Sequence, residues 1–145
     1  MTWTLLHDAC ENNRIDEICR LAGENPEDVL HAADDHGSTP LHLLCMQGNP
    51  DIRAVESLLD ACPQALSDKD FHGNTPLHAA CSSPNVDRHL VKVLLDAYPD
   101  AATTANREGL LPLHMACRYA PNSEGVIGIL IEANPQALQS HIKVK

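Results

Sequence analysis

The sequence predicts an all-α solenoid of four stacked helix-turn-helix units joined by β-hairpin loops. A stretch that runs from Asn74 to Cys81 recurs in recognisable form three more times along the 145 residues. The cysteines that close the four copies stand at 10, 45, 81 and 117, so successive copies are 35, 36 and 36 residues apart. A fixed period between about 20 and 50 residues is typical of stacked repeats and outranks the interpretation of any single segment.

Each copy carries signals for the start of a helix. Thr precedes Pro at 39–40 and at 75–76, where the hydroxyl can accept a bond from an orphan amide and Pro fits the first helical position. A Gly stands two residues earlier, at 37, 73 and 109, and suits a tight turn that needs a positive φ. The motif's Leu and the Cys four residues later share one helical face, which we expect to be buried.

With Thr-Pro-Leu-His at a helix start, the chain resembles the ankyrin-repeat family over nearly its whole length. The resemblance implies that His42 and His78 tie the Thr hydroxyl to the backbone of the neighbouring loop. His7 keeps its Thr but lacks the Pro, while His114 follows Leu111 in place of Thr and loses one expected bond. Restoring the cap with Leu111→Thr is therefore predicted to stabilise the fourth unit by about 1 kcal/mol.

The first unit, 1–33, starts abruptly. Its first helix is predicted from Thr4 to Asn12, and the apolar face of the second comprises Ile15, Ile18, Leu21 and Ala22. Trp3 stands just outside the first helix, where a hydrophobic staple or an end-cap contact is a better interpretation than a binding anchor.

The units 34–68, 69–104 and 105–145 share a stricter plan, counted from the closing Cys. The sixth residue after it is a good N-cap for a second helix (Asp51, Asp87 and Ser123). Apolar residues follow at helical spacing, and the eighteenth residue is a Pro that ends the helix just before it (Pro63, Pro99 and Pro135). A Pro-x-Ala sequence then replaces the Gly-Ala that is usual in the family.

The last unit differs from a typical terminal repeat. Its apolar run from Val126 to Ile131 keeps the pattern of an internal unit, whereas a terminal unit usually has a polar outer face. We expect this end to be covered by a continuation of the protein or by self-association.

Charge and composition exclude several classes of partner. The net charge of −10 argues against nucleic acid, which needs a basic stripe, and is compatible with a basic protein partner. The longest apolar run is too short for membrane insertion. Six cysteines without a secretory signal predict a reducing, intracellular compartment, which we take to be the cytoplasm, with the nucleus as an open alternative.

The repeated histidines (7, 42, 78 and 114) and cysteines (10, 45, 81 and 117) resemble a metal or nucleophile set. Equivalent residues of stacked helices are separated by about 8–10 Å, however, whereas zinc ligands lie about 2.0–2.3 Å from one centre. The closing cysteines are better interpreted as small buried hydrophobes. Cys19 and Cys62 fall outside the register, and Cys62 stands at a helix end. We therefore predict no catalytic residue, no metal and no cofactor.

In ankyrin proteins the hairpin tips and the exposed ends of the first helices form a concave recognition surface. This implies a non-catalytic module that binds a protein or peptide there, with Phe71, Arg107, Arg118 and Tyr119 as anchors. By position, the tip residues are Asp35, His36, Ser38, Phe71, His72, Asn74, Arg107, Glu108 and Leu110, and those after the closing cysteines are Met46, Gln47, Ser82, Ser83, Arg118 and Tyr119.

Two alternatives stay open on the sequence alone. The chain could be a targeting or regulatory segment of a larger enzyme or channel, which the apolar last unit favours. It could instead be a thiol or metal enzyme, for which an exposed thiolate of low pKa or stoichiometric zinc would be the evidence.

Overall fold

A computed structural model describes residues 4–30, 36–47 and 50–136. The α-helices of these residues are α1 (Leu5–Glu11), α2 (Ile15–Glu24), α3 (Pro40–Cys45), α4 (Ile52–Ala61), α5 (Pro76–Cys81), α6 (Arg88–Ala97), α7 (Pro112–Tyr119) and α8 (Glu124–Ala133). Three short 3-10 helices accompany them: η1 (Pro26–Leu30), η2 (Pro63–Ser67) and η3 (Pro99–Thr103).

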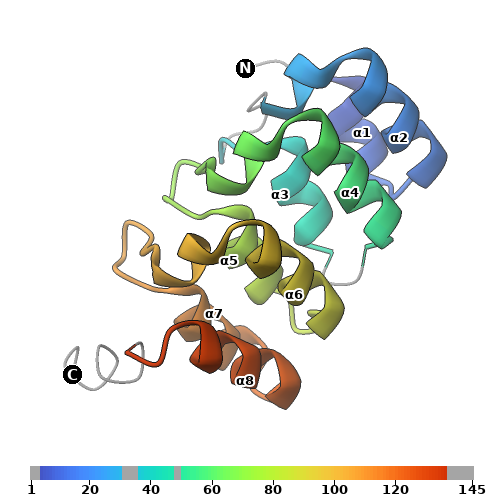
Figure 1. Cartoon of the computed structure of the whole chain (residues 1–145). Helices are drawn as coiled ribbons and strands as arrows, with labels where there is room; N and C mark the ends of the chain where they lie inside the picture. Colours follow the sequence, from blue (N-terminus) through green and yellow to red (C-terminus); the bar gives the residue numbers. More distant parts are fainter. Residues whose placement is uncertain (1–3, 31–35, 48–49, 137–145) are drawn as a thin grey trace.

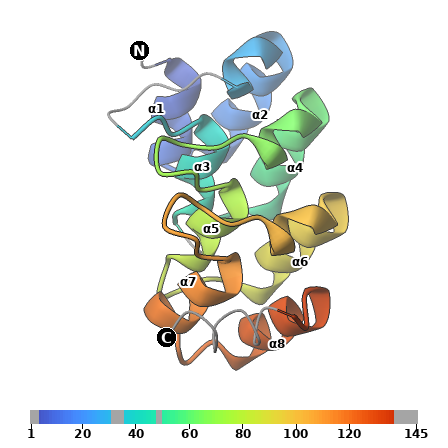
Figure 2. The ribbon, with the colours of Figure 1, turned by 90° about the vertical axis from the view of Figure 1, so that its left-hand side faces the viewer.

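The helices lie in two layers that run the length of the molecule (Figure 1). The odd-numbered helices stack on one another in sequence order, and the even-numbered helices form a second stack beside them (Figure 2). Helix α1 packs on α3, α3 on α5 and α5 on α7, while α2 packs on α4 and α6 on α8. Neighbours in sequence are thus neighbours in space, which confirms the predicted all-α solenoid.

One continuous apolar core runs between the two layers. The leucine of every motif copy is buried, with exposed fractions of 3% or less at Leu6, Leu41, Leu77 and Leu113. The second helices contribute the apolar face that their spacing predicts, since Ile18, Val55, Val91 and Leu130 are all buried. All of these residues belong to one core cluster that extends through the units, so the core holds the stack together as well as each helix pair.

The prediction that every closing cysteine is buried is wrong for the last one. Cys10, Cys45 and Cys81 are fully buried, whereas Cys117 is exposed. The first three face a following helix of the same layer, and the described residues place none beyond α7. Ile127, on α8, is only half-buried, and the described residues likewise place no helix of its layer beyond α8.

The N-caps of the second helices are only partly as predicted. Asp51 accepts the N–H of Arg53 at 2.8 Å, and Asp87 accepts that of Leu90 at 3.3 Å. Ser123 occupies the predicted position but forms no side-chain cap bond, which corrects the prediction there.

The prolines after the second helices end the α-helices as predicted but do not end the helical backbone. Pro63 and Pro99 each open a 3-10 helix, and Pro26 does so in the first unit. Proline fits this position because a first helical residue needs no N–H donor.

The loops that join the units form tight turns, and the described loop residues include no regular strand. Backbone hydrogen bonds connect successive loops: Phe71 N donates to His36 O at 2.8 Å, and Arg107 N donates to His72 O at 3.0 Å. None of the helices in the described part of the chain has the length and apolarity that a membrane crossing requires. Trp3 lies outside the described residues, so its predicted role as a staple stays a prediction.

Candidate functional site

The first helices begin with a paired cap formed by the motif's Thr and His. In α5 the Thr75 hydroxyl lies 3.0 Å from His78 Nδ1 and accepts the His78 N–H at 3.4 Å. The Thr75 N–H donates to the same Nδ1 at 3.2 Å. Helix α3 repeats this geometry with Thr39 and His42. The cap satisfies two of the amides that a helix start leaves without a backbone partner.

The other ring nitrogen of the same histidines reaches the next unit. His42 Nε2 lies 2.8 Å from the carbonyl of Asn74, and His78 Nε2 lies 2.9 Å from that of Leu110. A carbonyl oxygen can only accept, so Nε2 carries the proton and Nδ1 acts as the acceptor of the cap. Each histidine therefore fixes the loop of the following unit against its own helix.

Burial sets the protonation of this network. His78 is fully buried, and its desolvation lowers its pKa below the ordinary value of 6.5. The neutral form also suits the hydrogen bonds, because a proton on Nδ1 would remove the acceptor of the cap. The histidines of the motif thus act as structural groups.

The hairpin turns are built around an acidic or amide side chain. Asp70 Oδ1 accepts the N–H groups of His72 and Asn74, each at 2.9 Å. Asn106 Oδ1 does the same for Glu108 and Leu110, each at 3.0 Å. Such bonds hold a turn in one conformation without a regular strand.

The predicted glycines have the expected positive φ, at 72° for Gly37, 77° for Gly73 and 80° for Gly109. Close approach adds a second requirement at two of them. A Cβ on Gly37 would lie 2.6 Å from the ring of Phe71, and one on Gly73 would lie 2.9 Å from the backbone nitrogen of Arg107. The Phe71 ring therefore rests on the preceding turn while 45% of the residue stays exposed.

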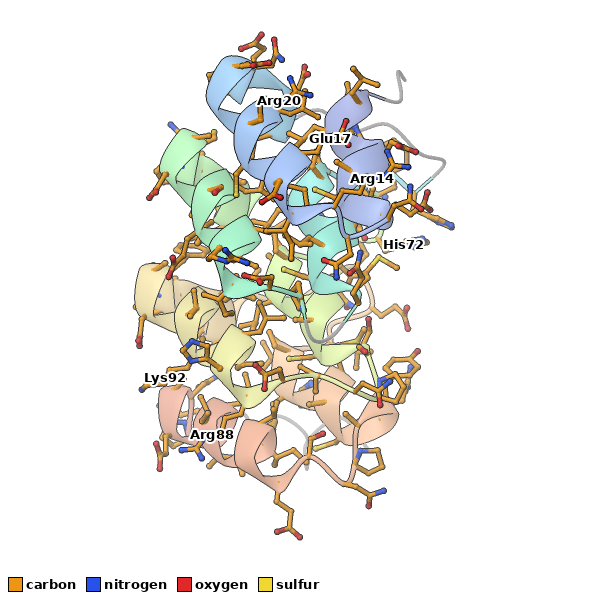
Figure 3. The ribbon with its side chains drawn as sticks, turned by 90° about the vertical axis from the view of Figure 1, so that its right-hand side faces the viewer. Arg14, Glu17, Arg20, His72, Arg88 and Lys92 are labelled. Atoms are coloured by element: carbon orange, nitrogen blue, oxygen red, sulfur yellow. The ribbon has the colours of Figure 1, made fainter. Side chains whose placement is uncertain are left out.

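A cavity of about 260 Å³ opens between the turns and the ends of α3 and α5. Ala79 and Ser82 lie on α5 and just after it, Met46 just after α3, and His36 and His72 at the turns. The lining residues are His36, Ser38, Met46, Asp70, His72, Asn74, Ala79 and Ser82. Figure 3 shows His72 on the side of the first helices, opposite Arg88 and Lys92 on α6. We call the surface formed by this cavity, the turns at 70–75 and 106–110 and the ends of α3, α5 and α7 the concave groove.

The sequence model of a known family, described as ankyrin repeats (3 copies), matches residues 6–103 and 53–139. The two matches together cover most of the chain. It belongs to the ankyrin-repeat family. Ankyrin repeats are generally protein–protein interaction modules. No curated protein shows significant similarity to this ankyrin-repeat chain.

Most of the ankyrin surface positions predicted from the sequence are accessible. Those that are exposed are His36, Met46, Phe71, His72, Arg107, Glu108, Arg118 and Tyr119, and those that are half-buried are Gln47, Asn74, Ser82 and Leu110. Asp35 lies outside the described residues. The cavity brings together six of the predicted residues, namely His36, Ser38, Met46, His72, Asn74 and Ser82.

Several of the predicted residues have roles within the repeat stack. Ser38 and Ser83 are 3% and 8% exposed, so they offer little surface to a partner. Gln47 Nε2 donates to the carbonyls of Cys10 and Glu11 in the first unit. Asn74 Oδ1 accepts the Asn106 side chain at 2.9 Å, a bond between neighbouring turns. Gln47 and Asn74 therefore also hold neighbouring units together.

The buried cysteines of this ankyrin array are poor nucleophiles. Burial raises the pKa of the Cys10 and Cys81 thiols to about 12 and that of Cys45 further still. Cys62 is buried, and its thiol donates to Gln64 Oε1 at 3.1 Å. The described residues include no group of three or more His, Cys, Asp or Glu side chains arranged to hold a metal ion.

One arrangement in the groove was not predicted from the sequence. His36 and His72 lie side by side, with ring centroids 5.6 Å apart. Both stand one residue before the turn glycine, 36 residues apart, so the repeat period itself was the available signal. The helix-spacing estimate was applied only to the motif histidines and cysteines; the turns approach one another more closely, since a backbone hydrogen bond of 2.8 Å joins Phe71 to His36.

Proposed function

We propose that this chain is a non-catalytic module that binds a protein partner along the concave groove. The observation that carries the proposal is the position of its exposed apolar side chains. Among the described residues the large hydrophobic side chains that are exposed are Leu5, Met46, Phe71 and Tyr119. All but Leu5, the first residue of α1, fall at positions that the ankyrin resemblance assigns to recognition.

The chemistry of these side chains suits a protein surface. Aromatic residues and arginine dominate interface hot spots, and the flexible thioether of methionine adapts to irregular partners. The Arg118 guanidinium lies 6.0 Å from the Tyr119 ring centroid, so a cation and an aromatic face are offered together at the end of α7. The groove can therefore take apolar and anionic side chains of one partner at neighbouring points.

Structural use of the motif histidines supports a non-catalytic role. His42 and His78 are buried and bonded at both ring nitrogens, so neither is available as a general base. Cys10, Cys45 and Cys81 are fully buried with raised pKa values, so none is poised as a thiolate nucleophile.

A quantitative pull-down from native lysate tests the proposal. The wild-type chain is compared with Phe71→Ala/Tyr119→Ala, which removes the two exposed aromatic rings of the groove. Leu5→Ala is the matched control, because it truncates an exposed apolar side chain outside the groove. Circular dichroism and an unfolding curve establish that all three proteins are folded.

We expect a saturable partner that wild type and Leu5→Ala retain and that the double variant loses by about tenfold or more in affinity. Retention of the partner by the double variant at unchanged affinity would overturn the assignment of the groove. An equal loss of affinity in Leu5→Ala would instead indicate a binding site at the α1 end of the stack.

A further inference from the structure

The turns that precede α3 and α5 bring two imidazoles within reach of a single atom. His36 Nδ1 and His72 Nε2 form a hydrogen bond of 3.4 Å, in which one nitrogen donates and the other accepts, and the two rings are tilted by 36°. Both side chains are exposed at the rim of the concave groove. Two ring nitrogens at this separation belong to different units of the stack, so a ligand held by both would join those units.

The separation matches the spacing of two ligands of one metal ion. Two imidazole nitrogens about 2.0–2.1 Å from a tetrahedral ion are separated by about 3.4 Å. Metal binding releases the proton of the hydrogen bond between the two nitrogens, and each lone pair then turns about 35° from the line that joins them to converge on the ion. Exposed imidazoles can make this rotation without moving the backbone.

The backbone on both sides of the pair is held in place. Phe71 N donates to His36 O at 2.8 Å, which links the two turns next to the histidines. Asp70 Oδ1 accepts the His72 N–H at 2.9 Å and fixes the second turn. The Phe71 ring covers Gly37, which directly follows His36. Because the backbone next to both histidines is fixed before the metal binds, binding costs less conformational entropy.

We propose that His36 Nδ1 and His72 Nε2 form a binding site for a divalent transition metal ion such as zinc, nickel or copper. Imidazole nitrogen suits these ions, whereas magnesium and calcium prefer oxygen ligands. Water, or a donor group from a bound partner, completes the coordination. The described residues supply two ligands, so the site binds metal more weakly than a closed structural zinc site with four.

Isothermal titration calorimetry with Ni²⁺ alone, under reducing conditions, tests the site in the chain of 145 residues. Three variants accompany the wild type: His36→Ala, His72→Ala and His89→Ala. His89 is exposed on α6 and is the matched control. All three substitutions fall on exposed side chains, and circular dichroism checks that the variants fold.

We expect one Ni²⁺ per chain in the wild type and in His89→Ala. Each groove variant should bind about tenfold more weakly or worse, because the second imidazole acts at a high effective concentration. Saturating Ni²⁺ should also raise the thermal unfolding midpoint of the wild type by about 2–6 °C, and not that of the groove variants.

Equal Ni²⁺ affinity in all four proteins would overturn the site. Loss in only one of the two groove variants would overturn the pairing and indicate a single-imidazole contact. The titration contains no protein partner, so its failure would leave the proposed function of the groove untouched, and the pull-down would leave the metal site untouched.

Discussion

At the scale of single residues, His42 and His78 each connect the first helix of their unit to the turn of the next unit. Nδ1 of His78 accepts the cap of its own helix, and Nε2 donates to Leu110 of the following unit. The same side chain is fully buried, so each of its bonds replaces one that water can no longer supply. Local helix formation and stacking of the units are therefore coupled through a single imidazole.

This coupling predicts that the array loses stability as the pH falls below about 6.5. The folded pKa of His78 lies below its ordinary value of 6.5, so the unfolded chain takes up the proton first. The stabilisation is present above that value and is lost as the pH falls through the folded pKa. One such histidine changes the free energy of unfolding by at most about 1.4 kcal/mol per pH unit.

The measurement is urea unfolding of the wild type, His78→Gln and His89→Ala between pH 7.5 and 5. We expect His78→Gln to be less stable by about 1–3 kcal/mol at neutral pH, because the Leu110 carbonyl loses the N–H group that donates to it. Its dependence on pH should be flatter than that of the wild type. An identical slope in His78→Gln, or the same flattening in the exposed His89→Ala, would contradict this role.

The structure reverses one expectation drawn from the sequence. Leu111 forms no side-chain cap, as predicted, but it is only 8% exposed and belongs to the core. Leu111→Thr removes about two carbons of buried surface, worth about 1.6 kcal/mol, and gains a cap worth about 1 kcal/mol. We now expect a net loss of roughly 0.5–1 kcal/mol.

Leu111→Val separates the two effects, because valine has the shape of threonine without its hydroxyl. In denaturant unfolding, the expected order of stability is wild type, then Leu111→Thr, then Leu111→Val. A threonine variant as stable as the wild type would contradict this balance, because the cap formed by threonine would then offset the whole loss of buried leucine surface.

The thiols provide a third test at this scale. Burial raises the pKa of Cys10 and Cys81 to about 12, whereas Cys117 is exposed. A thiol-specific chromophore should label Cys117 quickly in the folded protein and the buried thiols only on the timescale of unfolding. Cys117→Ser should remove one equivalent of the fast reaction. An unchanged fast phase in that variant would contradict the described end of the stack.

Sequence spacing predicted these residues unequally well. The Thr–His cap and its reach to the next loop followed from the family motif, and both are confirmed at His42 and His78. The exposure of Cys117 did not follow, because a repeat pattern describes an internal unit and contains no information on what lies beyond the last helix. Burial depends on the neighbour and not on the motif.

At the scale of elements, the turns between units combine a positive φ with close packing. Gly73 and Gly109 have nearly the same φ, 77° and 80°. A Cβ at Gly73 would meet the Arg107 backbone nitrogen at 2.9 Å, whereas one at Gly109 would have nothing within 4 Å. The two positions therefore differ in packing and share the same backbone requirement.

Alanine substitution should separate the two contributions. We expect Gly109→Ala to lose about 1–2 kcal/mol of unfolding free energy through backbone strain alone. Gly73→Ala should lose clearly more, because the Arg107 backbone has to shift. Chemical denaturation of both variants measures the difference, and equal losses would show that the two turns do not pack as described.

Element boundaries were predicted best where one residue dictates the backbone. The positive-φ glycines and the prolines that end the second helices belong to this group. The 3-10 helices that begin at Pro26, Pro63 and Pro99 were missed, since proline indicates both the end of one helix and the start of another. Ser123 was predicted to cap α8 on residue type, yet a cap also requires side-chain geometry that the sequence does not specify.

At the scale of the whole molecule, stacking produces a surface that no single unit contains. The cavity of about 260 Å³ is lined by two neighbouring units, and the His36–His72 pair exists only because two turns meet. Family resemblance predicted which face would carry the groove. Its depth, the burial of Ser38 and Ser83 and the histidine contact depend on distances between units, which period and composition do not encode.

Amide hydrogen exchange of the chain, with and without its captured partner, tests the central claim most directly. Binding along the concave groove predicts added protection in the turn segments 70–75 and 106–110 and at the ends of α3, α5 and α7. The outer faces of α4, α6 and α8 should remain unchanged. Protection confined to those outer helices would contradict the account.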